Sequence, residues 1–217
     1  MVAGQLALPI PLMGEVGEGG LGQPVDVRAK GQTRPARSFW WDRERPAEAG
    51  ILRAVIFDAD SALADIERDG DVAARTGLID LVMSLFVAGI WVGVVSTRRR
   101  ERVETLVRQL LGDGLVETIV TVDDLPDVVA GPGCEAELYR LALWEMGITH
   151  RSALAVAGSV RGLRAAVAAE LPGVIVSTGK QFVGAAEVRD GYDGADPLRA
   201  TGCQQAHRRW WIAQRVA

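Results

Sequence analysis

From residue 51 onward, the chain alternates between two patterns of apolar positions. Short, nearly continuous apolar runs are typical of strands covered on both faces, and we expect strands over 51–57, 90–95, 116–122, 153–157 and 173–177. Apolar residues at helical spacing predict a helix from Leu78 to a stop at Gly89, and further helices over 98–111, 135–146 and 160–171. Five strands alternating with four helices predict an α/β fold, a three-layer, doubly wound, parallel five-stranded sheet with right-handed crossovers.

The same periodicity groups residues along each helix. In the first helix Leu78, Leu81, Val82, Leu85 and Phe86 fall on one face, in the second Val103, Leu106, Val107 and Leu110 point inward, and in the third Leu138, Leu141, Ala142 and Glu145 stand at helical spacing. The polar stretch 64–71 is interpreted as a loop.

Three regions follow from composition. Residues 1–50 are rich in Gly and Pro and are predicted to form an arm with little structure of its own. Residues 51–180 form the α/β core, and 181–217 form an extension whose end, 197–216, is predicted to be a helix on the core. Phe39-Trp40-Trp41 favours packing of the arm on its own domain over a partner site. Trp40-Trp41 and Trp210-Trp211 are expected to meet, since domain termini are often close.

Composition narrows the class of protein. The 217 residues carry a formal net charge of −4, which argues against a general nucleic-acid binder. No stretch is long enough to span a bilayer. Cys134 and Cys203 lie far apart and outside any CxxC motif, so two reduced thiols in a cytoplasmic protein are the simpler interpretation. The predicted C-terminal helix mixes Trp with Arg, a pattern found in helices that lie on a membrane or on a partner protein. We prefer the alternative that this helix covers the edge of the protein's own sheet.

Polar and small residues stand at three predicted strand tips. Asp58 and Asp60 follow the first strand, Ser96-Thr97 the second, and Gly158-Ser159 the fourth. Ligands of open parallel sheets bind at this edge. If the strand geometry persists, Asp58 and Asp60 point the same way and need a cation or proton between them, which makes them a candidate magnesium and nucleophile site. The alternative is a strand end turning into a loop, where Asp is common.

Three motifs in order carry a resemblance to a known family. No dinucleotide fingerprint or P-loop is present. The motifs are Asp58-Ala59-Asp60-Ser61-Ala62-Leu63 after a strand, Val94-Val95-Ser96-Thr97 ending a strand, and Val156-Ala157-Gly158-Ser159-Val160-Arg161-Gly162-Leu163-Arg164-Ala165-Ala166 joining a strand to a helix. Over about 51–180 the chain resembles the haloacid dehalogenase-like hydrolase superfamily.

This resemblance implies a Mg²⁺-dependent phosphatase site. Asp58 would be the nucleophile that forms an aspartyl-phosphate, and Asp60 the acid and base. Ser96 and Thr97 would contact the phosphoryl oxygens, and Asp58 with the carbonyl of Asp60 would bind the metal. Only 38 positions separate Asp58 from Ser96 (96 − 58), so no inserted helical cap domain is expected and the site would be open.

The chain departs from the family pattern at the residues that balance charge. Gly133 stands where the third motif has Lys, Ala157-Gly158 where the fourth has acids, and Ser61-Ala62 where the first has Gly-Thr. Candidate substitutes for the lysine are Lys180 and the run Arg98-Arg99-Arg100, although an arginine fork does not replace a compact ammonium. Candidate substitutes for the acids are Asp123, Asp124, Asp190, Asp193 and Asp196.

Two hypotheses of different class follow. In the first, the site is impaired and the protein is a pseudoenzyme or binding protein with low or absent catalysis, because each missing electrostatic donor costs ~3–4 kcal/mol. In the second, it is an active Mg²⁺-dependent phosphatase. The partner is a small phosphorylated ligand or another protein, and the sequence leaves the oligomeric state open.

Overall fold

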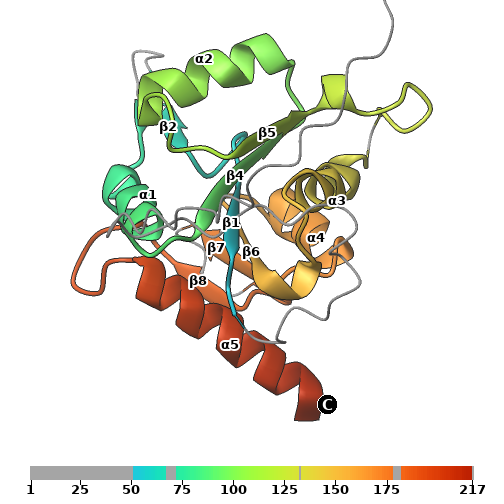
Figure 1. Cartoon of the computed structure of the whole chain (residues 1–217). Coiled ribbons are helices and arrows are strands. Elements are labelled where there is room, and N and C mark those ends of the chain that lie inside the picture. Colours follow the sequence, from blue (N-terminus) through green and yellow to red (C-terminus); the bar gives the residue numbers. More distant parts are fainter. Residues whose placement is uncertain (1–50, 67–71, 132, 178–181, 217) are drawn as a thin grey trace, which may run out of the picture. The chain divides into compact units, whose positions relative to one another are not determined.

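The computed structural model describes residues 51–66, 72–131, 133–177 and 182–216, all within the compact unit Gln32–Ala217. Its main sheet is entirely parallel, with strand order β5-β4-β1-β6-β7-β8 (Figure 1). The strands are β1 (Ala54–Asp58), β4 (Trp91–Ser96), β5 (Thr118–Thr121), β6 (Ala153–Ala157), β7 (Gly173–Val176) and β8 (Glu187–Arg189). β1 therefore lies inside the sheet, between β4 and β6.

Helices cover both faces of this sheet (Figure 1). They are α1 (Leu78–Val87), α2 (Arg100–Leu111), α3 (Glu135–Glu145), α4 (Val160–Ala168) and α5 (Ala200–Val216), with short 3₁₀ turns at Val122–Asp124 and His150–Ser152. Buried residues of α1, α2 and α5 share one core with Val55 and Phe57 of β1. Buried residues of α3 and α4 share the other core with Ala54 and Ile56. Alternate residues of β1 thus point into opposite layers, as its unbroken apolar run requires.

The predicted three-layer α/β fold is confirmed, but its strand count was wrong. The sheet has six strands, because β8 adds to β7 at one edge. The sequence of β8, Glu187-Val188-Arg189, is short and charged, which is typical of an edge strand and hides it from an apolar-run search.

The stretch expected to be a loop contains a strand pair. β2 (Ala64–Ile66) and β3 (Val72–Ala74) form a small antiparallel sheet between β1 and α1. No further element is described in 59–77, so this segment leaves no room for a cap domain.

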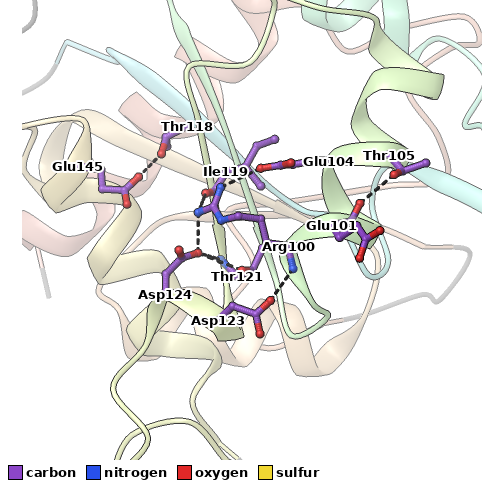
Figure 2. Close-up of polar contacts among 10 residues, drawn as sticks. All are labelled: Arg100, Glu101, Glu104, Thr105, Thr118, Ile119, Thr121, Asp123, Asp124 and Glu145. Carbon is purple, nitrogen blue, oxygen red and sulfur yellow. Dashed lines mark hydrogen bonds and ion pairs between the residues drawn. The ribbon is translucent and has the colours of Figure 1, made fainter.

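Two residues at these helical spacings are exposed. Phe86 is 41% exposed although its neighbours on the α1 face are buried. In α3 the buried positions are Leu138, Tyr139, Ala142 and Leu143, while Glu145 is exposed. Glu145 lies at the end of the helix, where its carboxylate accepts a hydrogen bond from the Thr118 hydroxyl (Figure 2).

The C-terminal helix α5 contributes to the core of its own domain. Cys203 and Ala206 are fully buried in the cluster that also holds the α1 face. His207 is buried as well, and Trp211 packs against it edge-on at 6.3 Å between ring centroids. The arm 1–50, with Trp40-Trp41, lies outside the described residues, and so does the predicted meeting of the Trp pairs. None of the helices in the described ranges has the length and apolar character needed to cross a bilayer.

Candidate functional site

Asp58 is the last residue of β1 and is buried in the carboxyl edge of the sheet. Its side chain accepts two hydrogen bonds: the Asp60 amide donates to Oδ1 at 3.0 Å, and the Ser61 hydroxyl donates to Oδ2 at 2.6 Å. Burial raises the pKa of Asp58, the bond from Ser61 opposes the rise, and the charges of Asp60 and Glu135 add to it. The carboxylate is therefore held in place while its charge is poorly compensated.

A turn, rather than strand alternation, positions Asp60. The strand ends at Asp58, and the amide of Ala62 donates to the Asp58 carbonyl at 2.8 Å, which closes the turn. The Asp60 carboxylate consequently reaches the tip of β4. Ser96 Oγ donates to its Oδ1 at 2.8 Å, and the amide and hydroxyl of Thr97 donate to its Oδ2 at 2.9 and 2.8 Å.

All four sequence-predicted site residues line one cavity of about 220 Å³. Asp58 and Asp60 come from the end of β1, and Ser96 and Thr97 from the end of β4. The structure brings the four together, but the hydroxyls of Ser96 and Thr97, expected to contact phosphate, both donate to Asp60.

Three further residues of this cavity were missed by the sequence reasoning. Glu135 begins α3 and forms an ion pair with Arg161 of α4. The Tyr139 hydroxyl is buried without a hydrogen-bond partner among the described residues. Burial raises the pKa of Tyr139 well above its usual range, and the charges of Asp58 and Asp60 reinforce this. A search for polar residues in the first turns of the helices entering this edge would have found Glu135 and Arg161.

The position of the family's lysine is unsuited to a side chain. Gly133 has φ +93°, a left-handed conformation that strains any residue except glycine. The two cations among the described lining residues are both engaged with acids other than Asp58: Arg98 Nε lies 3.1 Å from Asp60 Oδ1, and Arg161 pairs with Glu135. Lys180 lies outside the described residues.

The position of the family's fourth-motif acid is closed by the backbone of Ser61. A Cβ added to Gly158 would lie 1.8 Å from the Ser61 carbonyl oxygen. The Gly158 amide donates to Ser61 Oγ at 2.9 Å, and that hydroxyl in turn donates to Asp58. Ser61 and Gly158 thus interlock across the sheet, and no side chain fits at 158 unless the turn moves.

The acids proposed as substitutes lie elsewhere. Asp124 accepts from Arg100 Nη2 at 2.7 Å, and Asp123 accepts from the Arg100 amide at 2.9 Å, both next to the edge strand β5 (Figure 2). Asp196 pairs with Arg189. None of these acids, nor Asp190 or Asp193, is among the described residues that line the cavity.

The oxygen atoms around Asp58 and Asp60 are a poor match to the ligands that Mg²⁺ requires. Mg²⁺ takes oxygen ligands in octahedral geometry, usually one or two carboxylates beside water and phosphate oxygens. Within the described ranges, no three His, Cys, Asp or Glu side chains converge into a metal-binding group. Both oxygens of Asp58 already accept hydrogen bonds, and the carboxylate of Asp60 faces four donor contacts at the tip of β4.

Comparisons with known proteins identify relatives that match about 70% of the chain. The chain is 33% identical to protein CbbY of Cereibacter sphaeroides over 182 residues, covering 71% of this chain and 78% of CbbY. The crystal structure of CbbY from Rhodobacter sphaeroides in complex with phosphate gives a TM-score of 0.59 at 20% identity, covering 70% of this chain and 99% of that one. A mutant of the same protein, in complex with xylulose-(1,5)bisphosphate, gives the same values.

A third solved structure carries the family name. It is from Bacteroides fragilis, is described as a haloacid dehalogenase-like hydrolase, and gives a TM-score of 0.56 at 14% identity over 64% of this chain and 97% of that one. No family model matches the chain. The identity with CbbY, on the fold that these structures share, shows that the chain belongs to the haloacid dehalogenase-like hydrolase superfamily.

Proposed function

We propose that this protein uses the hydrolase fold to bind a small phosphorylated molecule, with low or absent hydrolysis. The observation that carries the proposal is the interlock of Ser61 and Gly158, which fills the place of a metal-binding carboxylate with backbone. A phosphoryl group beside Asp58 would meet a buried carboxylate without the usual metal and lysine charges. Each missing electrostatic contribution costs ~3–4 kcal/mol of transition-state stabilisation, so two of them reduce turnover to near background.

The ligand class is proposed from the family and the site together. CbbY is described in complexes with phosphate and with a sugar bisphosphate, and this chain keeps hydroxyl, amide and guanidinium donors at the tip of β4. Such donors suit phosphate oxygens. We propose a weakened Mg²⁺ site at Asp58 and the Asp60 carbonyl, and a cytoplasmic location in keeping with two buried free thiols.

The alternative function is an active Mg²⁺-dependent phosphatase. It is favoured by one observation, the presence of both Asp58 and Asp60 in the wall of a single cavity. In that mechanism Asp58 attacks phosphorus to form an aspartyl-phosphate while Asp60 gives a proton to the leaving oxygen, and Asp60 then takes a proton from the attacking water.

A phosphatase assay separates the two functions. Release of phosphate from a chromogenic aryl phosphate and from xylulose-(1,5)bisphosphate is measured with and without Mg²⁺, beside the matched variant Asp58→Asn. We expect the wild-type rate to equal that of the variant, and, because the proposed Mg²⁺ site is weakened, we expect Mg²⁺ alone to raise the melting temperature only slightly. Metal-dependent turnover that disappears in Asp58→Asn would establish the phosphatase instead.

A further inference from the structure

A tyrosine of the C-terminal extension reaches the turn that follows β1. Tyr192 lies between β8 and α5 and is fully buried. Its hydroxyl donates a buried hydrogen bond to the carbonyl oxygen of Ala62 at 2.7 Å, across 130 positions of the sequence. Its ring packs edge-on against Phe57 of β1, with 6.4 Å between the ring centroids. The extension therefore contacts both the strand that carries Asp58 and the turn that follows it.

Ala62 is the residue at which this turn closes. Its amide donates to the Asp58 carbonyl at 2.8 Å, and its own carbonyl accepts from Tyr192. Between Asp58 and Ala62 in the sequence lie two donors to the Asp58 side chain. The Asp60 amide donates to Asp58 Oδ1, and the Ser61 hydroxyl donates to Asp58 Oδ2. The position of Ala62 therefore determines how well both donors face the Asp58 carboxylate.

The backbone of Tyr192 is itself held against α1 and the start of α5. Its carbonyl accepts from the Leu198 amide at 3.0 Å and from Arg199 Nη1 at 3.3 Å. Arg199 Nη2 donates to Asp80 of α1 at 3.0 Å, where the segment before α5 passes beside α1 (Figure 1). A Cβ added to Gly77 would lie 2.9 Å from the carbonyl carbon of Tyr192, so no side chain separates these two backbones. The phenol therefore reaches the turn from a fixed support.

The hydroxyl of Tyr192 has a role that its ring cannot supply. Phenylalanine would fill the same space in the core but would leave the Ala62 carbonyl without this donor. Ala62 is fully buried, so its carbonyl cannot turn to water instead, and a buried polar group that loses its partner is costly. The other of the chain's two tyrosines, Tyr139, is also buried, yet its hydroxyl has no partner among the described residues. Burial alone therefore does not account for the bond from Tyr192 to the turn.

We propose that Tyr192 is a positioning residue for the candidate site. Its hydroxyl holds the turn 58–62 in the geometry in which Asp60 and Ser61 donate to the Asp58 carboxylate. The C-terminal extension thus contributes to the construction of the site as well as to the core. The inference rests on the proposed function in one respect, since it takes the Asp58 cavity as the ligand site.

Amide hydrogen exchange of the full-length protein, followed residue by residue by NMR, tests the proposal. Tyr192→Phe is expected to speed exchange of the Asp60 and Ala62 amides about tenfold, because one buried hydrogen bond no longer opposes local opening of the turn. The Asp60 amide resonance is expected to shift as well, because its bond to Asp58 Oδ1 is no longer held in place.

Ser84→Ala is the matched control. The Ser84 hydroxyl also joins the C-terminal extension to the core, but its hydrogen bonds go to the Ala200 amide and the Leu81 carbonyl rather than to the turn. We expect this variant to lose stability while the Asp60 and Ala62 amides keep their wild-type exchange rates. Exchange that rises equally in both variants, or that stays unchanged in Tyr192→Phe, overturns the proposal, because Tyr192 would then act only through overall stability.

A labelled protein keeps the test decisive. Circular dichroism establishes that each variant folds. If Tyr192→Phe does not, 3-fluorotyrosine in a Tyr139→Phe background labels Tyr192 alone, since the chain has two tyrosines. Exchange of the Asp60 and Ala62 amides is then compared with that of the same variant without the label, with altered exchange supporting the proposal and unaltered exchange overturning it.

Failure of this inference is distinct from failure of the proposed function. Metal-dependent turnover, or no binding of phosphate, would sink the proposed function and leave the exchange comparison standing. A flat exchange comparison would sink only the positioning role of Tyr192.

Discussion

Two carboxylates at the carboxyl edge of the sheet have nearly the same partners but different surroundings. Asp60 accepts from the amide and hydroxyl of Thr97 and pairs with Arg98, and Asp124 accepts from the amide and hydroxyl of Thr121 and pairs with Arg100 (Figure 2). Asp124 is three residues from Thr121 and closes a capping box around one 3₁₀ turn. Asp60 and Thr97 are 37 residues apart and meet only because β1 and β4 are neighbours.

This difference distinguishes a cluster that stabilises one turn from a cluster that lines the candidate functional site. The Asp124 cluster satisfies the backbone groups of its own turn and lies at the edge strand β5. Asp124 lines neither the cavity that contains Asp58 nor a wider groove of about 940 Å³ along α2. The Asp60 cluster joins two strand tips, and Asp60, Ser96 and Arg98 line both the cavity and the groove. Similar hydrogen-bond chemistry therefore stabilises one turn in the first case and holds a cavity-lining carboxylate in the second.

The largest expected effect comes from moving the turn that carries Asp60. In Gly158→Ala the new Cβ would overlap the Ser61 carbonyl oxygen, so the turn after β1 must shift, and we expect a loss of about 3 kcal/mol or more in the free energy of unfolding. Gly131→Ala is the control, since nothing lies within 4 Å of a Cβ there. Chemical denaturation measures both, and a Gly158→Ala loss as small as that of the control would show that the turn is not held by Gly158.

The parts of the molecule fixed by local pattern were predictable, and those fixed by distant contacts were not. The apolar run before Asp58 predicts β1 and its place at the carboxyl edge, because a strand buried on both faces needs little beyond its own sequence. β8 was missed because a short charged edge strand has no apolar run. The partners of Asp60 were missed because alternation along a strand does not apply once the strand ends at Asp58.

The positions where the family has charge-balancing side chains show the same limit of prediction from sequence. That Gly133 and Gly158 lack the family's side chains was visible in the sequence. That no side chain fits at 158 depends on the backbone of Ser61, 97 residues away, and could be learned only from the fold. Tyr139 likewise reaches the cavity through helix packing that the sequence does not specify, whereas Glu135 and Arg161 lie in first helical turns that a sequence search could have singled out.

A smaller effect on the free energy of unfolding, with a defined pH dependence, is expected at the Asp124 cluster. Burial alone would raise the pKa of Asp124, but hydrogen bonds from Arg100 and Thr121 outweigh it and hold the pKa below its usual value. The carboxylate therefore stabilises the fold above the unfolded-state pKa of about 4, and this contribution is lost as pH falls through the lower folded-state pKa.

The matching variant is Asp124→Asn. We expect it to lower the free energy of unfolding by roughly 1–2 kcal/mol at pH 7 and by much less below about pH 3. Urea denaturation at several pH values measures the difference, and phosphate affinity should stay at the wild-type value. A loss independent of pH would mean that the charge of Asp124 does not matter, and a change in phosphate affinity would remove the contrast with Asp60.

The smallest effect concerns Arg99 and Arg102, which line the α2 groove, because exposed charges are screened by water and salt. Arg99→Gln/Arg102→Gln should weaken phosphate binding by about two- to fivefold at low salt, and the difference should shrink at about 0.5 M salt. Arg108→Gln is the matched control, since Arg108 is an exposed arginine of the same helix that pairs with Asp113 and does not line the groove. If the control weakens binding as much as the double change does, the two groove arginines act through net charge alone. A loss confined to Arg99 and Arg102 instead places the ligand beside the first turns of α2, on the side where Asp60 contacts Ser96, Thr97 and Arg98.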